Sequence, residues 1–467
     1  MPKSNQTTPR ETNLGPLLEV SLDDVPRPQR SEALGTRLRT AIRNGSLPSG
    51  TRLPPSRLLA VDLGVSRGVV VRVYEQLTAE GYLNARHGAG TQVADTLAPV
   101  APAPHRTYRP PTNPGLPEGG LFPRRVWLRA ASRALAELTN EDLGYGDPAG
   151  LARLRSALSS YLGRARAVIA PADLIVVVNG FAQATRLLGE VLLGRGIAEI
   201  AVEDPGSVGL RDQLTRVGMV CRPVPVDEEG LRVDVLETIA VRAVVVTPAH
   251  QFPTGVVMSP DRRHRLLEWA RAKGGLVIED DYDAEYRYDR SPVGAIQGLG
   301  PDVVAYGGSV SKTLAPGLRI GWLVLPDLLV GALAQAKYAT DLATGVWEQA
   351  TLSEFITSGE MDRHIRRTGT RYQARRDRLV AELTARLPGW TIAGAGAGLH
   401  VLVYPSAGRE ERELVSLAQR SGLDARPLGD YAVAETDRPG LVIGYGHQHP
   451  STLAGAVERL AAILQAG

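Results

Sequence analysis

The sequence has a single cysteine, few aromatic side chains and no long hydrophobic run. Cys221 alone excludes an internal disulfide framework and a zinc site built on cysteines, and no metal site is predicted. No stretch of about 18 apolar residues occurs, so no transmembrane helix is expected. The first residues, MPKSNQTTPRETN, lack the apolar core of a secretory signal peptide. Because one free thiol suits a reducing compartment, we expect a cytoplasmic protein.

The length of the chain predicts more than one domain. A single hydrophobic core rarely grows to the size that 467 residues would require. Residues 1–25 show no apolar periodicity and are expected to form a flexible tail. Residues 95–117 are rich in Pro and Ala, and because proline lacks an N–H and fixes φ, this segment is typical of a linker. We therefore predict one domain over 26–94 and another over 118–467, whose large part ends and small part begins near residue 340.

The first domain is basic. Ten arginines lie between Pro26 and Asp95, against five acidic residues, so the segment carries a net charge of about +5. A compact basic unit at one end of a chain is typical of a nucleic-acid-binding domain. The alternative is a solvated basic surface with no such partner.

The pattern in this domain indicates a helix-turn-helix followed by a hairpin. We expect three helices and two short strands: Ser31–Asn44, Arg57–Leu63, Ser66–Glu80, Tyr82–Ala85 and Thr91–Val93. Ser56 and Ser66 are expected to cap the second and third helices. Val70, Val73 and Leu77 fall on one helical face and should be buried. The order predicts a winged helix-turn-helix, whose third helix would enter the major groove of DNA.

The segment GTRLPPSRLLAVDLGVSRGVVVRVYEQLTAEGYLNARHGAGTQV strongly resembles the DNA-binding domain of the GntR family. The resemblance covers about Arg30–Ala94 and implies binding to an operator in double-stranded DNA. Gly68 stands where relatives often have Asn. The residues that the resemblance assigns to DNA contacts are Arg57, Ser66, Arg67, Arg72, His87 and Gly88.

In the second domain, short apolar runs alternate with helical segments. The expected strands are Leu174–Val178, Ile200–Val202, Val244–Val246, Leu276–Ile278 and Val303–Tyr306. Helices such as 182–193, 209–216 and 260–273 separate most of them. This alternation predicts a mostly parallel sheet covered by helices on both faces. A smaller α+β part should follow, with strands near Leu399–Tyr404 and Leu441–Tyr445.

The stretch YGGSVSKTLAPGLRIGWLVL suits the chemistry of pyridoxal 5'-phosphate (PLP). This cofactor requires a lysine that forms an imine with its aldehyde, together with hydroxyls and an arginine for its phosphate. Ser309 precedes Lys312 by three residues and Arg319 follows it by seven. Lys312 lies in a loop after an apolar strand, which distinguishes it from an ordinary surface lysine.

Two further segments could complete a PLP site. In VIEDDYDAEYRY, Asp280 could face the pyridine nitrogen and Tyr282 could bond the phenolic oxygen, although a solvated acidic loop is the alternative. Asn179-Gly180 precedes a helix, and the backbone N–H groups at a helix start can bind phosphate.

These segments, together with GYGDPAG and TPAHQFPTG, resemble fold-type I aminotransferases from about Leu121 to the C-terminus. Joined to a GntR-like domain, they resemble the MocR family of regulators. That resemblance implies a head-to-tail homodimer in which Tyr145 reaches the partner's cofactor phosphate. Lys312 would be the Schiff-base lysine, and no catalytic residue is assigned. The cofactor-binding residues implied are Lys312, Asp280, Tyr282, Ser309, Arg319, Phe181, Ala182 and Tyr145.

Three positions depart from the aminotransferase pattern. Ser207 replaces an aromatic residue that stacks on the cofactor ring, and Phe252 replaces the Asn before the PTG turn. Val442 occupies the place of the arginine that binds the substrate carboxylate. Arg426 and Arg366 are both candidates to replace that arginine.

The favoured interpretation is a DNA-binding regulator whose large domain binds PLP and senses PLP itself or an amine or amino-acid effector. An active aminotransferase with a DNA-binding domain is the first alternative, because every group for imine chemistry is present. A regulator whose large domain has lost PLP and serves only for dimerisation is the second.

Overall fold

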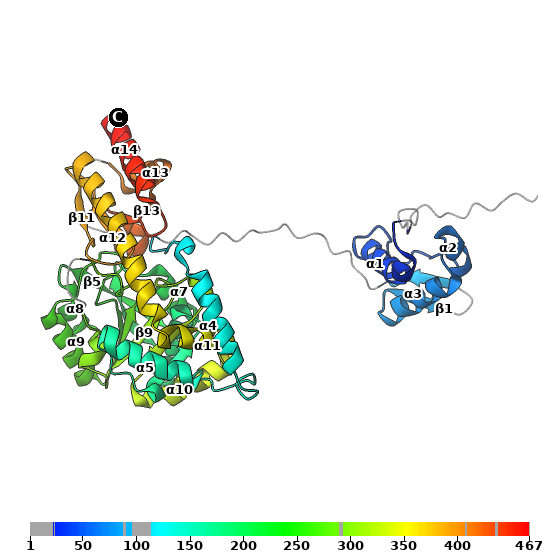
Figure 1. Cartoon of the computed structure of the whole chain (residues 1–467), viewed down its shortest axis with the longest axis horizontal. Coiled ribbons are helices and arrows are strands. Elements are labelled where there is room, and N and C mark those ends of the chain that lie inside the picture. The colour runs from blue at the N-terminus through cyan, green and yellow to red at the C-terminus, as the bar shows by residue number, and fades with distance from the viewer. Residues whose placement is uncertain are drawn as a thin grey trace, which may run out of the picture. The chain divides into compact units, whose positions relative to one another are not determined.

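The computed structural model describes residues 22, 24–86, 90–95, 114–288, 293–406, 409–434 and 438–466. The chain forms two compact units, residues 1–110 and 111–467, shown in Figure 1. The predicted tail and linker lie mostly outside the described residues. No helix in the described part of the chain is long and apolar enough to span a bilayer.

The first unit is a winged helix-turn-helix, as predicted. Its elements are α1 (Arg30–Arg43), α2 (Ser56–Asp62), α3 (Arg67–Ala79), β1 (Leu83–Arg86) and β2 (Gly90–Val93). The strands β1 and β2 pair antiparallel, with Leu83 opposite Val93. Leu34 and Leu38 of α1 pack against Val70 and Leu77 of α3 in a continuous core.

The turn between α2 and α3 depends on Gly64, whose φ is 58°, a value that glycine adopts without strain. Of the two expected serine caps, only Ser66 holds its predicted position, and neither side chain makes a capping hydrogen bond. Ser56 lies inside α2, whose N-cap position is held by Pro55. Ser66 does occupy the N-cap position of α3, but its side chain makes no capping hydrogen bond. Its hydroxyl therefore stays at the exposed start of the helix.

The second unit contains an eight-stranded sheet in the order β3-β10-β9-β8-β7-β4-β5-β6. The neighbours from β9 to β5 run parallel, whereas β10 runs antiparallel to both β3 and β9. The sheet is thus mostly parallel, as the sequence predicted. Its strands are β3 (Ile175–Val178), β4 (Glu199–Asp204), β5 (Val220–Asp227), β6 (Gly230–Leu231), β7 (Ala243–Val246), β8 (Leu276–Asp281), β9 (Val304–Ser309) and β10 (Gly321–Val324).

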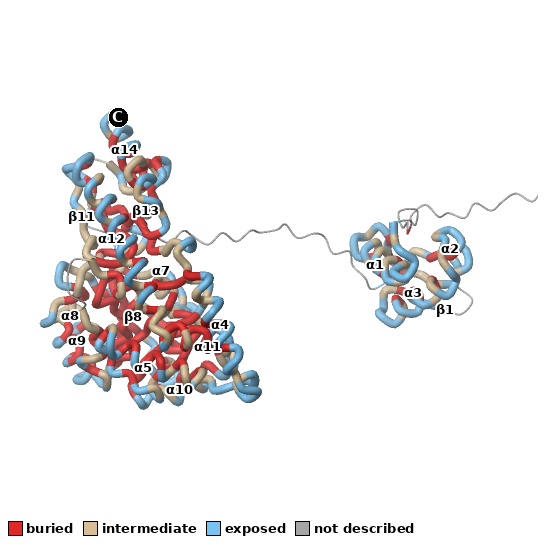
Figure 2. The backbone as a smooth tube through the Cα atoms, in the orientation of Figure 1, coloured by how far each residue is buried: buried red, intermediate tan, exposed pale blue. Residues whose placement is uncertain are grey.

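Helices pack on both faces of this sheet, which explains why several of its strands are apolar along their whole length. Every residue of β3, β7 and β10 is buried, and Figure 2 shows this buried centre in red. The helices are α4 (Arg124–Glu137), α5 (Ala152–Arg166), α6 (Phe181–Gly194), α7 (Val208–Arg216), α8 (Val233–Leu236), α9 (Pro260–Lys273), α10 (Asp327–Asp341) and α11 (Val346–Thr357).

The C-terminal part holds a four-stranded antiparallel sheet in the order β11-β12-β14-β13. Its strands are β11 (Thr391–Ala393), β12 (His400–Tyr404), β13 (Asp424–Pro427) and β14 (Leu441–Gly444). Three helices accompany it: α12 (Glu360–Arg386), α13 (Glu411–Arg420) and α14 (Pro450–Ala466). In Figure 1 the long helix α12 runs from beside α5 and α11 to this smaller sheet.

A buried ion pair joins α5 to the end of β8. Arg166 donates from Nε to Asp281 Oδ2 at 2.7 Å and from Nη2 to Oδ1 at 3.2 Å, and both side chains are 2% exposed. Tyr306 of β9 donates its hydroxyl to the same Asp281 Oδ2 at 2.7 Å. Three elements are therefore fixed together at the strand end that precedes Tyr282.

Asp281→Asn should lower the free energy of unfolding of the second unit by about 3–5 kcal/mol, because it removes the carboxylate that forms an ion pair with the buried Arg166 guanidinium. All five tryptophans lie in this unit, so urea unfolding followed by tryptophan fluorescence reports on it alone. Asp302→Asn is the matched control. It breaks an exposed pair with Arg271 and should cost less than about 1 kcal/mol. Equal losses for the two variants would contradict the assigned role of the buried pair.

Candidate functional site

Four strand ends meet at one edge of the large sheet. Gly321 of β10 lies opposite both Val178, the last residue of β3, and Ser309, the last residue of β9. Asp281, the last residue of β8, lies opposite Gly308. The register therefore brings together the loops that follow β3, β8 and β9. These loops carry most of the residues that the sequence assigned to PLP.

The start of α6 and the Arg319 guanidinium form a site suited to an anion. No side chain caps the helix, whose first residue is Phe181, so its first N–H groups are available to a ligand. Gly180 has φ 82° and ψ 169°, a conformation essentially restricted to glycine. Arg319 donates from Nη2 to the carbonyl of Asn179 at 2.7 Å. Partial and full positive charges thus converge on this edge.

Lys312 and Asp280 lie in each other's electrostatic field. Burial lowers the pKa of Lys312, whereas the nearby carboxylates of Asp283 and Asp280 raise it. Burial raises the pKa of Asp280 well above its ordinary value, and Asp281 and Asp283 add to that shift, while Lys312 opposes it. The environment therefore favours the uncharged amine that attacks a carbonyl.

A buried histidine network lies beside these two residues. The hydroxyl of Tyr282 is 3.0 Å from His250 Nδ1, and the same nitrogen is 3.1 Å from each carboxylate oxygen of Asp283. The rings of His250 and His400 lie 5.1 Å apart. Sequence reasoning missed both histidines. TPAHQFPTG indicated only a turn, and no local pattern connects His400 to a residue 150 positions earlier.

The three departures from the aminotransferase pattern each have a structural counterpart. Ser207 caps α7, with its hydroxyl accepting from the N–H of Leu210 at 3.4 Å. The ring of Phe252 lies 6.0 Å from that of Tyr282 and 5.1 Å from that of Tyr431. Ser207 thus serves as a helix cap, and the Phe252 ring forms an aromatic wall with Tyr282 and Tyr431.

Val442 is fully buried against Leu402 and Leu428. Arg426 lies directly opposite Val442 on the neighbouring strand, β13. Arg366 is exposed on α12 and lines a separate cavity of about 260 Å³ with Tyr161. Only Arg426 is thus in register with the position that the arginine occupies in aminotransferases.

Tyr145 lies apart from the other predicted cofactor ligands. Its side chain is 81% exposed, and it lines a cavity with residues of the loop before α11. Leu143, Leu342 and Trp347, which are 62%, 41% and 42% exposed, lie in the loop of Tyr145, in the loop before α11 and at the start of α11. An exposed group of large apolar side chains is typical of a surface that another protein covers.

The start of α3 carries the predicted DNA-contacting residues of the first unit. Ser66, Arg67 and Arg72 are exposed, and so is Arg57 on α2. Arg67 Nε lies 3.5 Å from the hydroxyl of Ser56, and among the described residues neither Arg57, Arg67 nor Arg72 forms an ion pair. His87 and Gly88 lie outside the described residues.

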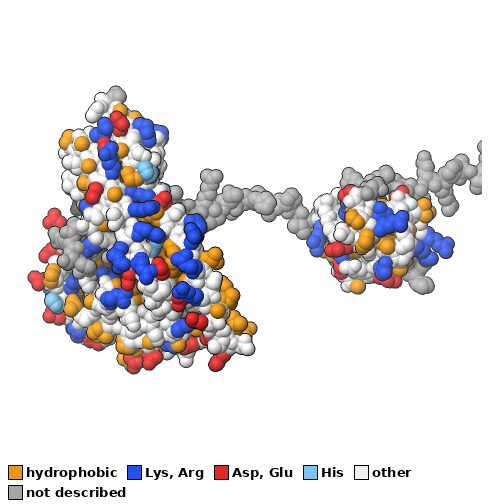
Figure 3. Space-filling view, in the orientation of Figure 1, with side chains coloured by type: hydrophobic (Ala, Val, Ile, Leu, Met, Phe, Trp, Pro, Cys, Tyr) orange, Lys and Arg blue, Asp and Glu red, His pale blue; other side chains and the backbone are white. Residues whose placement is uncertain are grey.

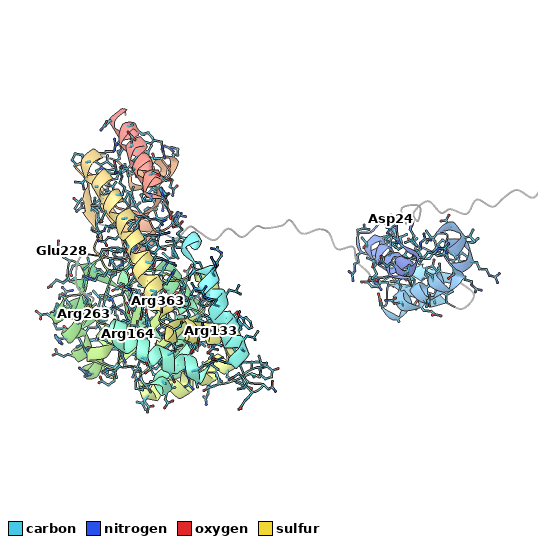
Figure 4. The ribbon with its side chains drawn as sticks, in the orientation of Figure 1. Asp24, Arg133, Arg164, Glu228, Arg263 and Arg363 are labelled. Atoms are coloured by element: carbon cyan, nitrogen blue, oxygen red, sulfur yellow. The ribbon has the colours of Figure 1, made fainter. Side chains whose placement is uncertain are left out.

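Other arginines of this unit have partners within it. Arg37 pairs with Asp24 at 2.8 Å, the residue labelled in Figure 4, and Arg39 pairs with Glu80 at 2.6 Å. Figure 3 shows basic side chains on the exposed surface of the unit. The structure therefore separates paired arginines on α1 from arginines on α2 and α3 that remain available to phosphate or bases.

Two family models match the chain. "Bacterial regulatory proteins, gntR family" matches residues 30–93, and "Aminotransferase class I and II" matches residues 115–433. Together they define a transcription regulator that joins a DNA-binding unit to an aminotransferase-like domain.

The chain belongs to the MocR family of such regulators. It is 33% identical to the probable rhizopine catabolism regulatory protein MocR of Rhizobium meliloti, over 94% of this chain and 93% of that protein. It is 31% identical to the HTH-type pyridoxine biosynthesis transcriptional regulator PdxR of Corynebacterium glutamicum, over 90% of this chain and 92% of that protein.

Solved structures confirm the fold of the second unit. The multiple substrate aminotransferase of Thermococcus profundus is similar with a TM-score of 0.69 and 28% identity, over 75% of this chain and 90% of that one. The kynurenine aminotransferase of Pyrococcus horikoshii, solved with PMP, gives 0.68 and 27%, over 75% and 89%. The fold is thus that of enzymes that use this cofactor.

Gly180→Ala should destabilise the second unit by about 1–3 kcal/mol. The new Cβ would lie 2.5 Å from Arg319 Nη2, and alanine does not tolerate the backbone conformation of this residue. Gly194→Ala, at the other end of α6, meets nothing within 4 Å and should be neutral or stabilising by up to about 1 kcal/mol. Thermal unfolding compares the two variants. An unchanged stability of Gly180→Ala would mean that the backbone before α6 and Arg319 adapt to the added methyl group.

Proposed function

We propose that this protein is a PLP-binding transcription regulator that senses PLP itself or an amine or amino-acid effector. The observation that carries the proposal is the convergence of Lys312, Asp280 and the anion site of α6 at one sheet edge, on a chain that also carries a DNA-binding unit. The relatives that share this architecture along nearly their whole length are named as regulators.

The donors present fit the cofactor. The N–H groups of Phe181 and Ala182, the hydroxyl of Ser309 and the guanidinium of Arg319 would hold its phosphate. Lys312 would bind its aldehyde and Asp280 its pyridine nitrogen, with Tyr282 on the phenolic oxygen. When bound, PLP supplies an aldehyde that reacts reversibly with primary amines.

The neighbouring residues prepare these groups for that task. A protonated pyridine nitrogen would stabilise the ionised form of Asp280, whose pKa burial otherwise raises. His250, which bonds both Tyr282 and Asp283, holds the tyrosine hydroxyl at a fixed position.

We propose a head-to-tail homodimer in which Tyr145 of one subunit reaches the phosphate bound by the other. The exposed apolar residues around Tyr145 support this arrangement, because such a surface is typical of a subunit interface. Leu128 and Leu135 of α4 extend the apolar surface and are 67% and 48% exposed. A site completed by two subunits could transmit ligand binding to their relative orientation.

Regulation then requires that the effector bind two states of the protein with different affinity. A ligand shifts an equilibrium only by its differential binding to the two states. An effector whose amine would take the place of Lys312 on the PLP aldehyde, and which also contacts the C-terminal sheet, would favour one arrangement of the large and small parts. Replacement of the carboxylate arginine by Val442 favours this sensing role over efficient transamination.

Added PLP should give the full-length protein a visible absorbance band that Lys312→Ala abolishes, because PLP held as an imine absorbs at longer wavelength than the free aldehyde and Lys312 is the lysine placed to form that imine. Borohydride reduction followed by peptide mass spectrometry should place the vitamer on Lys312. Lys273→Ala, at the exposed end of α9, is the control and should keep the band. A wild-type spectrum without the band would favour a large domain that serves only for dimerisation. Rapid multiple turnover with a keto acid would instead identify the protein as an active aminotransferase.

Arg67→Ala should weaken binding to the DNA upstream of its own coding sequence by about 1–3 kcal/mol. The reason is the exposed guanidinium at the start of the recognition helix, which no described carboxylate neutralises. Arg39→Met removes an arginine already paired with Glu80 and should leave the affinity nearly unchanged. Fluorescence anisotropy at fixed salt measures both, and equal affinities for Arg67→Ala and the wild type would remove Arg67 from the interface.

A further inference from the structure

One face of the C-terminal sheet is directed at the proposed cofactor site. Cross-strand partners in an antiparallel sheet project from the same face, and residues two apart on a strand share that face. In β12, β14 and β13, Leu402 lies opposite Val442, and Val442 lies opposite Arg426. His400, two residues before Leu402, shares the face with all three. The opposite face, with Val401 and Ile443, packs against α12, α13 and α14.

His400 shows where this face points. Its ring lies 5.1 Å from that of His250 and 5.2 Å from that of Phe252. Burial lowers the pKa of His400 well below its ordinary value, and the neighbouring His250 and Lys312 add to that shift. Arg426 therefore projects from the same sheet face that meets the loop of Lys312.

Aromatic rings connect Arg426 to Tyr282, one of the proposed cofactor ligands. Burial raises the pKa of Tyr431, and the charge of Arg426 opposes this, which places the guanidinium within the field of that ring. Tyr431 packs on Phe252, and Phe252 packs on Tyr282. The backbone carbonyl of Tyr431 accepts from the N–H of Gly206 at 3.0 Å, so this wall is fixed against the large sheet.

We propose that Arg426 binds the carboxylate of an effector whose primary amine would displace the Lys312 amine from the aldehyde carbon of PLP. This inference rests on the proposed PLP-binding function. Val442 offers no charge, but the neighbouring strand is only about 4.7–4.9 Å away, well within the length of an arginine side chain. The planar guanidinium binds a carboxylate through two parallel hydrogen bonds. The carboxylate-binding arginine thus lies on β13, one strand away from its position on β14 in aminotransferases, and it still faces the same site.

An effector carboxylate that binds Arg426 must compete with the acidic side chain of Asp424. Asp424 shares its sheet face and lies 3.8 Å from His447 Nδ1. Burial raises the pKa of Asp424, whereas His447 and Arg426 lower it. An amine without a carboxylate would gain nothing from Arg426. The site therefore selects amino acids over simple amines of the same length.

The experiment uses the full-length PLP-loaded protein and follows the change in its visible spectrum. The probes are ω-amino acids of increasing chain length, each compared with the n-alkylamine of the same length, and L-alanine compared with ethylamine. For the amino acid whose length matches the site, we expect binding about tenfold to a hundredfold tighter than for its amine, as a charge-assisted pair provides. Arg426→Met should abolish that preference and leave alkylamine binding unchanged.

Two further variants make the test specific. Arg438→Met removes an exposed arginine that stacks on Tyr404 of the same sheet, at 3.9 Å from the ring, and should retain the preference. Arg426→Lys keeps the charge but loses the bidentate geometry, so it should retain only part of the preference.

The outcomes separate the two proposals. A wild type with no PLP band would overturn the proposed function itself. A wild type with the band but equal affinity for amino acids and amines would overturn only the assignment of Arg426, and so would an Arg426→Lys or Arg426→Met variant that keeps the full preference. If Arg438→Met also lost the preference for amino acids over alkylamines, the preference would come from the net charge of the sheet and not from Arg426.

Discussion

The buried ion pair between Arg166 and Asp281 fixes the geometry on which the candidate site depends. It holds the end of β8 against α5, and the hydroxyl of Tyr306 ties the same carboxylate to β9. Asp280 and Tyr282 flank Asp281 directly, so their positions relative to the loop of Lys312 follow from this pair. Two charges removed from water keep their place only while both partners remain. Because each buried charge needs its partner, the ion pair also fixes the shape of the site.

Burial then acts in opposite directions on the reactive groups. It lowers the pKa of Lys312 and raises that of Asp280, so each group is moved toward its uncharged form until a ligand supplies the complementary charge. The uncapped start of α6 and Arg319 present the contrary situation, an excess of positive charge at the same edge. An anionic, aldehyde-bearing heterocycle with a basic ring nitrogen satisfies all three demands at once.

The C-terminal sheet explains how an aminotransferase fold can serve a regulator. Its inner face retains an aromatic and histidine surface toward the lysine, but the arginine stands on β13 instead of β14. A ligand that joins the PLP aldehyde to Arg426 would connect the large sheet to the small one. Such a connection can change the relation between two parts of a protein without requiring rapid turnover, and a DNA-binding unit on the same chain can respond to it.

The sequence by itself determined the elements and the local motifs. Apolar runs identified the strands of the sheet, and the spacing of Ser309, Lys312 and Arg319 indicated the cofactor, because these residues lie within one short stretch of the chain. The antiparallel β10, the Arg166–Asp281 pair and the approach of His400 to His250 were decided only by the tertiary structure, since each joins residues more than a hundred positions apart or depends on register. Arg426 is the clearest case. Its side chain became relevant only when strand pairing placed it opposite Val442, and no periodicity along the chain carries that information.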